Sequence, residues 1–120
     1  MSNTGILLVA HGSRDPNWKL PFEAIREETR RLFHGPVSLA YLESASPDFA
    51  AAIDELAAQD VKTIRIVPVF LAAGSHIRID LPRLVGTAKS RHGTIAFELT
   101  STAGESATVQ QAIAAFAVGR

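Results

Sequence analysis

LLVAHGSR (residues 7–14) and IVPVFLAAGSH (residues 66–76) are the two stretches that decide the fold of this chain. Each is an apolar run that stops in a glycine-containing turn bearing a histidine. Neither run alternates between apolar and polar residues, so each predicts a strand covered on both faces, as in a parallel sheet. Parallel strands end at the same edge of a sheet, where open α/β folds bind ligands. We therefore expect His11 and His76 to lie at one edge.

Strands and helices alternate along the rest of the chain. Further apolar runs predict strands at residues 5–10, 37–42, 61–67 and 94–99, with the third continuing irregularly to residue 70 beyond Pro68. Helical patterns cover about residues 18–33, 46–58 and 106–118, and a further helix takes up part of residues 79–91. Pro47 is expected in the first turn of the second of these helices, and Pro82 is the favoured start of the helix within residues 79–91. The order predicts one α/β domain over residues 1–120.

The predicted fold has three layers, with helices on both faces of a four-stranded parallel sheet. The favoured strand order is 2-1-3-4, as in flavodoxin-like folds, and its switch point lies between the first and third strands. Those strands precede His11 and His76, and the second strand, which ends at Glu43, lies beside the first. Neighbouring strands are only about 4.8 Å apart. Three side chains from adjacent strand ends are therefore expected to converge on one ion.

Two imidazoles and a carboxylate are typical ligands of divalent first-row metals. The sequence contains no cysteine, so a transition metal has only imidazole, carboxylate or water ligands available. Glu43 has an alternative role, in which it caps the turn at residues 44–47 or pairs with a surface arginine. His11 and His76 each lie beyond a strand end, where no helix cap is needed, and together they predict a functional site.

Composition and charge exclude several classes of protein. The 120 residues are 47% apolar, which is enough for a real core, and the twelve basic residues balance the twelve acidic ones. A net charge of zero argues against nucleic acid as the main partner. The longest apolar run, residues 66–73, is too short to cross a bilayer, and the N-terminus does not resemble a signal peptide. We expect a cytoplasmic protein without a membrane partner.

The other two histidines have simpler explanations. His34 and His92 each follow a predicted helix and precede a glycine, and a histidine is favoured at a helix C-terminus. Residues 91–93 (RHG) match the phosphohistidine tripeptide of histidine phosphatases by letters. In those enzymes the tripeptide follows the first strand, whereas here it follows a helix and precedes a strand, so we reject the match.

Several polar residues near the two histidine stretches are candidates for secondary roles. Asp80 is expected either to orient an imidazole or to cap the helix that follows, and the sequence does not separate the two. Arginine receives carboxylates through paired hydrogen bonds, although arginines on a neutral protein are more often solvated. The candidates for binding substrate carboxylates are Ser13, Arg14, Ser75 and Arg78.

Three ordered blocks resemble a known family. They are LVAHGSR (8–14), YLESASP (41–47) and VPVFLAAGSH (67–76), the last followed by DLP (80–82). Together they resemble the CbiX-type class II tetrapyrrole chelatases, the sirohydrochlorin cobaltochelatases and ferrochelatases. The likeness covers about residues 5–82, and three blocks in order are far more specific than one. Residues 101–105 match only loosely the glycine-containing loop expected after the last strand.

The resemblance implies an activity and a site. The activity is insertion of a divalent metal into sirohydrochlorin without ATP, on the way to cobalamin or sirohaem. His11 and His76 would handle the metal and accept protons, and Glu43 matches the acidic position beside them. Co²⁺ is favoured slightly over Fe²⁺ and Ni²⁺, as a substrate rather than a permanently bound cofactor. The short, single-unit form implies a homodimer that encloses the tetrapyrrole.

Two other functions make different demands on the sequence. A non-catalytic metal- or tetrapyrrole-binding protein of the same fold would use the same residues for affinity alone. A phosphate-transferring enzyme would need an Arg-His pair after the first strand, where Ala10 and His11 stand instead. The chelatase is the leading hypothesis.

Overall fold

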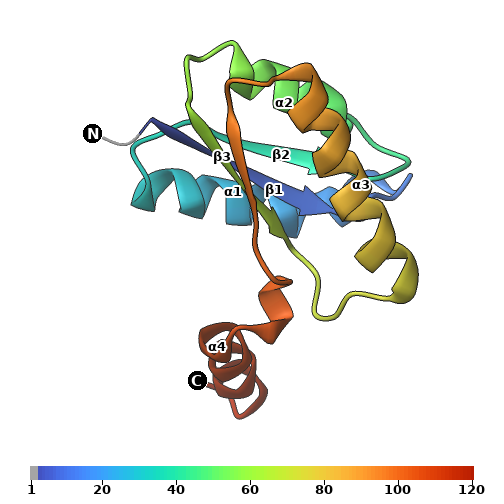
Figure 1. Ribbon diagram of the computed structural model, residues 1–120. Coiled ribbons are helices and arrows are strands. Elements are labelled where there is room, and N and C mark those ends of the chain that lie inside the picture. Colours follow the sequence, from blue (N-terminus) through green and yellow to red (C-terminus); the bar gives the residue numbers. More distant parts are fainter. Residues whose placement is uncertain (1–2) are drawn as a thin grey trace.

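The sheet has four parallel strands (Figure 1) in a computed structural model that describes residues 3–120. The strands are β1 (Thr4–Ala10), β2 (Val37–Tyr41), β3 (Thr63–Pro68) and β4 (Ala96–Leu99). Their order is β2-β1-β3-β4, and in the register Val9 lies beside Ala40 on one side and Pro68 on the other. This confirms the predicted 2-1-3-4 order, which brings the ends of β1, β2 and β3 to one edge.

Helices pack on both faces of the sheet. The helical elements are η1 (Pro16–Lys19), α1 (Leu20–Leu32), α2 (Phe49–Ala57), α3 (Ser75–Arg91), η2 (Ala103–Glu105) and α4 (Ala107–Ala117). α2 and α3 bury a core that includes Leu7, Ile53 and Ile66, whereas Trp18 and Phe22, near and within α1, pack on the opposite face. β1 and β2 are thus buried on both sides, which explains why their sequences do not alternate, whereas β3 and β4 alternate between buried and more exposed residues.

α2 begins later than its sequence indicates. The prediction of a helix from residue 46 with Pro47 in its first turn is wrong: the Ser46–Pro47 peptide bond is cis, and the helix starts at Phe49. The Tyr41 N–H donates to the Pro47 carbonyl at 3.0 Å, so this segment continues beside β2 instead of coiling. The side chain of Asp48 accepts from the N–H of Ala51 at 2.9 Å and caps the helix.

α3 begins earlier than predicted. Gly74 is its N-cap, and Pro82 lies inside the helix rather than at its start. The proline ring removes one backbone hydrogen bond, but Leu81, Val85 and Ala88 bury the helix against the core and outweigh that loss. Side chains that the sequence placed in a loop therefore project from a helix.

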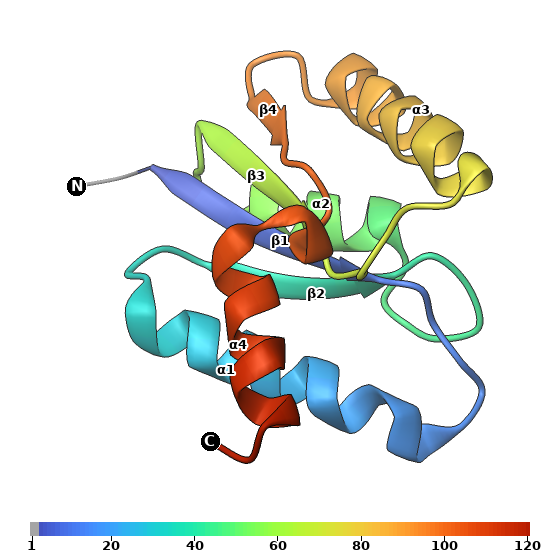
Figure 2. The same cartoon turned by 90° about the horizontal axis from the view of Figure 1, so that it is seen from below.

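α4 occupies the residues predicted for it, with Ser106 capping it through a hydrogen bond from the N–H of Val109 at 3.4 Å. It does not cover the sheet, and none of its residues is buried. Figure 1 shows α4 at the end of the chain, lying below the sheet and apart from the other helices, and in the view of Figure 2 it crosses in front of α1. The three-layer arrangement is thus complete on the α2 and α3 side, but on the α1 side it is complete only over β2 and β1.

The predicted structural histidines lie away from the strand ends. His92 is the C-cap of α3, and its Nε2 lies 2.8 Å from Oδ1 of Asp54 on α2. His34 follows the C-cap of α1 and is exposed. None of the helices among the described residues combines the length and the apolar character that a membrane crossing requires.

Candidate functional site

His11 and Glu43 form a close pair at the carboxyl edge of the sheet. The β1–β2 pairing continues past both strands, because Leu42 N–H donates to the Ala10 carbonyl at 3.1 Å and Glu43 N–H to the His11 carbonyl at 3.0 Å. This brings His11 Nε2 within 2.8 Å of Glu43 Oε1. The two side chains are 54% and 61% exposed, so both stay accessible to a ligand.

Gly12 makes this close approach possible. Its φ is +107°, a region that glycine favours, and a Cβ added there would lie 1.7 Å from the carbonyl oxygen of Glu43. Any other residue would push the two loops apart. The glycine after the first histidine is therefore a requirement of the His11–Glu43 geometry.

A cavity of about 570 Å³ opens at the same edge. This volume lies within the range of small-molecule sites, roughly 300–1,000 Å³. Its walls are His11, Leu42, Glu43, His76, Ile77, Asp80, Arg83 and Leu84. The structure thus places His11, Glu43 and His76 in the walls of one open cavity. We call it the histidine cavity.

His76 reaches this cavity from the first turn of α3 rather than from the end of β3. Helical spacing explains the wall that α3 provides, because residues 76, 80, 83 and 84 lie on one side of a helix. Within residues 3–120, no three His, Cys, Asp or Glu side chains lie close enough together to hold a metal ion. The metal-binding roles of His11, Glu43 and His76 stay a prediction.

Asp80 and Arg83 form a second polar pair in the cavity wall. Arg83 Nη1 lies 3.5 Å from Asp80 Oδ1. The prediction that Asp80 is an N-cap is wrong, because α3 is capped by Gly74; orientation of an imidazole by Asp80 stays a prediction. Sequence reasoning missed Arg83. Its signal was the spacing of three residues from Asp80 and seven from His76, which becomes visible once the helix is extended to Ser75.

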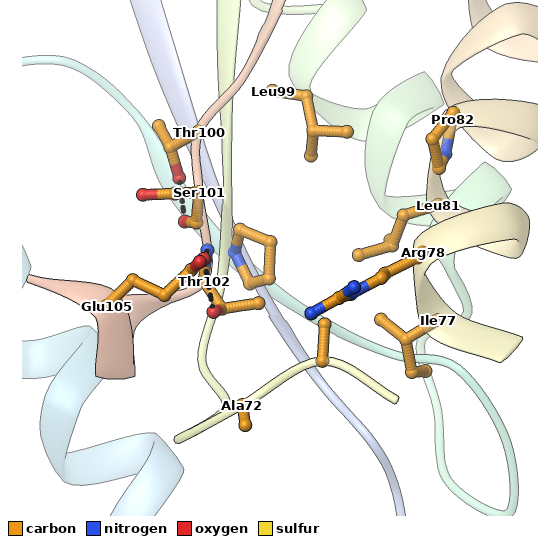
Figure 3. A pocket seen from close by; sticks show the side chains of 12 residues that line it. Ala72, Ile77, Arg78, Leu81, Pro82, Leu99, Thr100, Ser101, Thr102 and Glu105 are labelled. Carbon is orange, nitrogen blue, oxygen red and sulfur yellow. Dashed lines mark hydrogen bonds between the residues drawn. The ribbon is translucent and has the colours of Figure 1, made fainter. Parts of the chain in front are cut away.

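Arg78 lines a different, smaller cavity of about 250 Å³ (Figure 3). Figure 3 shows its side chain pointing into that cavity from α3, opposite Thr100, Ser101 and Thr102. Beside them, hydrogen bonds from the Thr102 hydroxyl and then from its backbone N–H hold the pKa of Glu105 below its usual value, and the charge of Arg78 adds to this. The two cavities share Ile77 in their walls.

The other three predicted binding residues are not among the side chains that line the histidine cavity. The Ser13 hydroxyl oxygen accepts a hydrogen bond from Asp15 N–H at 3.1 Å, which shapes the loop after β1. Arg14 and Ser75 are exposed. Binding of substrate by these three residues stays a prediction.

Comparisons with known proteins point in one direction. A sirohydrochlorin cobaltochelatase from Methanothermobacter thermautotrophicus is 37% identical over 89 residues, which cover 74% of this chain and 62% of the relative. The crystal structure of a cobalamin (vitamin B12) biosynthesis CbiX protein from Marinobacter aquaeolei has a TM-score of 0.87 at 31% identity and covers 96% of this chain and 94% of that chain.

A longer solved structure is also similar. The sirohydrochlorin chelatase SirB from Bacillus subtilis subspecies spizizenii, in complex with cobalt, has a TM-score of 0.74 at 27% identity, with 82% of this chain and 42% of that chain covered. This chain also spans less than two thirds of the length of the curated relatives it matches. The family model described as CbiX matches residues 5–117, and the chain therefore belongs to the CbiX family.

Proposed function

We propose that this protein inserts a divalent metal into sirohydrochlorin without ATP, with Co²⁺ favoured over Fe²⁺ and Ni²⁺. The observation that carries the proposal is the histidine cavity, in which His11, Glu43 and His76 line one open space at the carboxyl edge of the sheet. The names of the relatives support the same reaction, since one is a cobaltochelatase and another is a chelatase in complex with cobalt.

The chemistry of metal insertion suits this set of side chains. Insertion releases two protons from pyrrole nitrogens, and neutral imidazole is both a metal ligand and a proton acceptor near neutral pH. Glu43, 2.8 Å from the His11 ring, stabilises that imidazole when it carries a proton and adds an oxygen ligand for the incoming ion. His76, across the cavity, provides a second imidazole for the same two tasks.

Carboxylates of the macrocycle need cationic and hydroxyl partners around the cavity. Arg83 is already in its wall, and Asp80 holds that guanidinium while also lying one helical turn from His76. We assign the outer carboxylates to Arg14, Arg78, Ser13 and Ser75. Arginine binds a carboxylate through two parallel hydrogen bonds, which also set the orientation of the ring.

We also propose that residues 1–120 act as one domain and that two copies form a homodimer around the tetrapyrrole. The histidine cavity is open, and this chain matches 42% of the longer SirB chain, which is consistent with a site built from two such units. The metal and the macrocycle are both substrates, with no permanently bound cofactor. We propose a cytoplasmic location and partners that include neither nucleic acid nor membrane.

A turnover assay tests the function directly. Purified protein is mixed with sirohydrochlorin and Co²⁺, and insertion is followed through the absorption spectrum of the macrocycle. His11→Ala and His76→Ala are each expected to lower kcat by about 100-fold or more, the range for removal of an acid–base group. His34→Ala is the matched control, because His34 is exposed and lies outside the cavity wall.

The assay also separates this function from a binding protein of the same fold. A wild-type protein that fails to accelerate insertion of Co²⁺, Fe²⁺ or Ni²⁺ over the uncatalysed rate would contradict the enzyme proposal. If that protein still bound Co²⁺ in a titration, and the His11→Ala/His76→Ala double variant did not, the alternative of a non-catalytic metal-binding protein would replace it.

A further inference from the structure

His11 lies between the two segments that continue β2 and β3 beyond the sheet. On the β3 side, the Val69 N–H donates to the Val9 carbonyl at 2.8 Å, so the β1–β3 pairing continues past the end of the strand. The register places Val9 beside Pro68, and the same offset two residues further along places His11 beside Phe70. The aromatic residue that ends the third apolar run is therefore a neighbour of the first histidine.

The ring of Phe70 contacts the ring of His11. Their centroids are 6.5 Å apart and their planes meet at 75°, which is an edge-to-face arrangement. Aromatic pairs favour this arrangement at centroid separations of about 4.5–7 Å. His11 Nε2 also lies 2.8 Å from Glu43 Oε1. The imidazole is thus held by a carboxylate from the β2 segment and by an aromatic ring from the β3 segment.

The contact with Glu43 would not fix the His11 ring by itself. The side chains of His11 and Glu43 are 54% and 61% exposed, and exposed side chains change rotamer rapidly. Two exposed side chains joined at one point can therefore move together. Phe70 is only partly exposed and packs against the core under α2 and α3. It is the more rigid of the two neighbours of the imidazole.

η2 holds the backbone that carries Phe70. The Phe70 carbonyl accepts the N–H of Gly104 at 2.8 Å, and a Cβ on Gly104 would lie 1.9 Å from the Leu71 carbonyl oxygen. Beside this contact Thr102 is buried and forms a capping box with Glu105. A loop distant in the sequence thus fixes the segment from which the Phe70 ring reaches His11.

We propose that Phe70 is a positioning residue, which holds the His11 imidazole in the orientation that faces the histidine cavity. This rests on the role of His11 in the proposed function and adds the group that sets its geometry. The side chains that line the cavity do not include Phe70, so Phe70 acts through His11 rather than on the substrate. Orientation matters because the reacting atoms must be held about 3–3.5 Å apart for a fast reaction.

Mobility of the His11 ring tests the proposal without reference to catalysis. The four histidines are labelled with ¹³C at Cε1, each signal is assigned from a His→Ala variant, and relaxation gives an order parameter for each ring. Phe70→Leu is expected to lower the order parameter of His11 by about a third, the difference between a rigid and a flexible site. Phe70→Met, a second variant without a ring, should act alike, and Phe70→Tyr should keep the wild-type value.

Phe22→Leu is the matched control. Phe22 is also partly buried and also contacts an aromatic ring, that of Trp18 at a centroid distance of 4.4 Å, but it belongs to the core on the opposite face of the sheet. Its replacement should leave the order parameter of His11 unchanged. Urea denaturation measures the stability of each variant, so that mobility is compared where all of them are folded.

Kinetics with sirohydrochlorin and Co²⁺ give a second readout. Phe70→Leu is expected to lower kcat about tenfold with little change in KM, because a misplaced imidazole slows the reaction while the substrate does not contact Phe70. In the His11→Ala background the same substitution is expected to have no further effect on kcat, because the group that it positions is absent.

Other outcomes overturn the proposal. They are a His11 ring that stays rigid in Phe70→Leu, an equal loss of order in Phe22→Leu, and an undiminished effect of Phe70→Leu on kcat in the His11→Ala background. Failure of the proposed function gives a different result. A wild type that does not accelerate metal insertion, with a His11 ring that still becomes mobile in Phe70→Leu, removes the enzyme but not the positioning role.

Discussion

At the scale of single residues, the pairing of His11 with Glu43 depends on Gly12. We predict that Gly12→Ala destabilises the protein by more than about 2 kcal/mol, because the new Cβ meets the Glu43 carbonyl oxygen in a backbone conformation that alanine disfavours. Urea denaturation at neutral pH measures the change.

Gly86→Ala is the matched control. Gly86 lies inside α3, and a Cβ there would meet nothing within 4 Å. Alanine at this position is expected to stabilise the protein by about 0.5–1 kcal/mol, since it favours the helix. Equal effects of the two substitutions would show that the turn at Gly12 relaxes without cost, and would contradict the role given to it.

Arg83 is the residue of the histidine cavity that sequence reasoning missed. If it binds a carboxylate of the macrocycle, Arg83→Gln should raise KM for sirohydrochlorin about tenfold, the effect of one lost charged hydrogen bond, with kcat changed much less. Arg83→Lys should recover part of the loss. Steady-state kinetics at saturating Co²⁺ measure both.

The control for Arg83 is Arg31→Gln. Arg31 lies on α1, where it pairs with Glu28 at 2.9 Å, and it is not part of either cavity wall described above. The KM of the Arg31→Gln variant for sirohydrochlorin should equal that of the wild type. A tenfold fall in kcat without a change in KM for Arg83→Gln would instead place Arg83 in the chemical step.

At the scale of elements, α2 and α3 are joined by a charged cluster. Asp54 on α2 lies 2.8 Å from His92 Nε2 and 2.9 Å from Arg91 Nη2. The hydrogen bond to His92, followed by that from Arg91 and the charges of both, holds the pKa of Asp54 below its ordinary value of 3.8. His92 thus connects two helices, a role that its position before a glycine did not reveal.

This lowered pKa has a consequence for acid stability. A carboxyl group whose pKa falls on folding stabilises the folded protein above its unfolded pKa and loses that contribution as pH drops through the folded pKa. We predict that Asp54→Asn lowers the stability by a constant amount at neutral pH, and that the difference from wild type shrinks below about pH 3.8. Urea midpoints between neutral pH and about pH 2.5 measure it.

Glu55→Gln is the control for Asp54, because Glu55 is exposed on the same helix. Its stability difference from wild type should show no comparable decrease at low pH. If the stability difference between Asp54→Asn and wild type stayed constant down to the lowest pH, the cluster would stabilise the protein through packing rather than through charge.

At the scale of the whole molecule, the proposed dimer should govern activity. If the tetrapyrrole is held between two copies, a monomer provides only half of the side chains that surround it. We predict that specific activity per chain falls on dilution in parallel with the fraction of dimer. Turnover and sedimentation over the same concentration series measure the two curves. Activity that stayed constant while the dimer dissociated would show that one chain is sufficient.

The sequence by itself determined the sheet. The apolar runs at β1 and β2 do not alternate, which indicates burial on both faces, and the spacing of the strands leaves room for one helix in each crossover. The strand order 2-1-3-4 is the favoured one for four such strands, and it places His11 beside Glu43 through backbone hydrogen bonds that continue the β1–β2 pairing. These features are local or follow from chain connectivity, so a sequence pattern carries them.

Only the tertiary structure decided where α3 begins and where α4 lies. The burial of Leu81, Val85 and Ala88 stabilises α3 through Pro82, which moves His76 from a strand end onto a helix and adds Arg83 to the cavity wall. Contacts of Gly104 with Phe70 and Leu71 aim α4 away from the sheet. Both outcomes depend on packing between residues distant in the chain, whose free energy exceeds the local preferences that a sequence pattern reports.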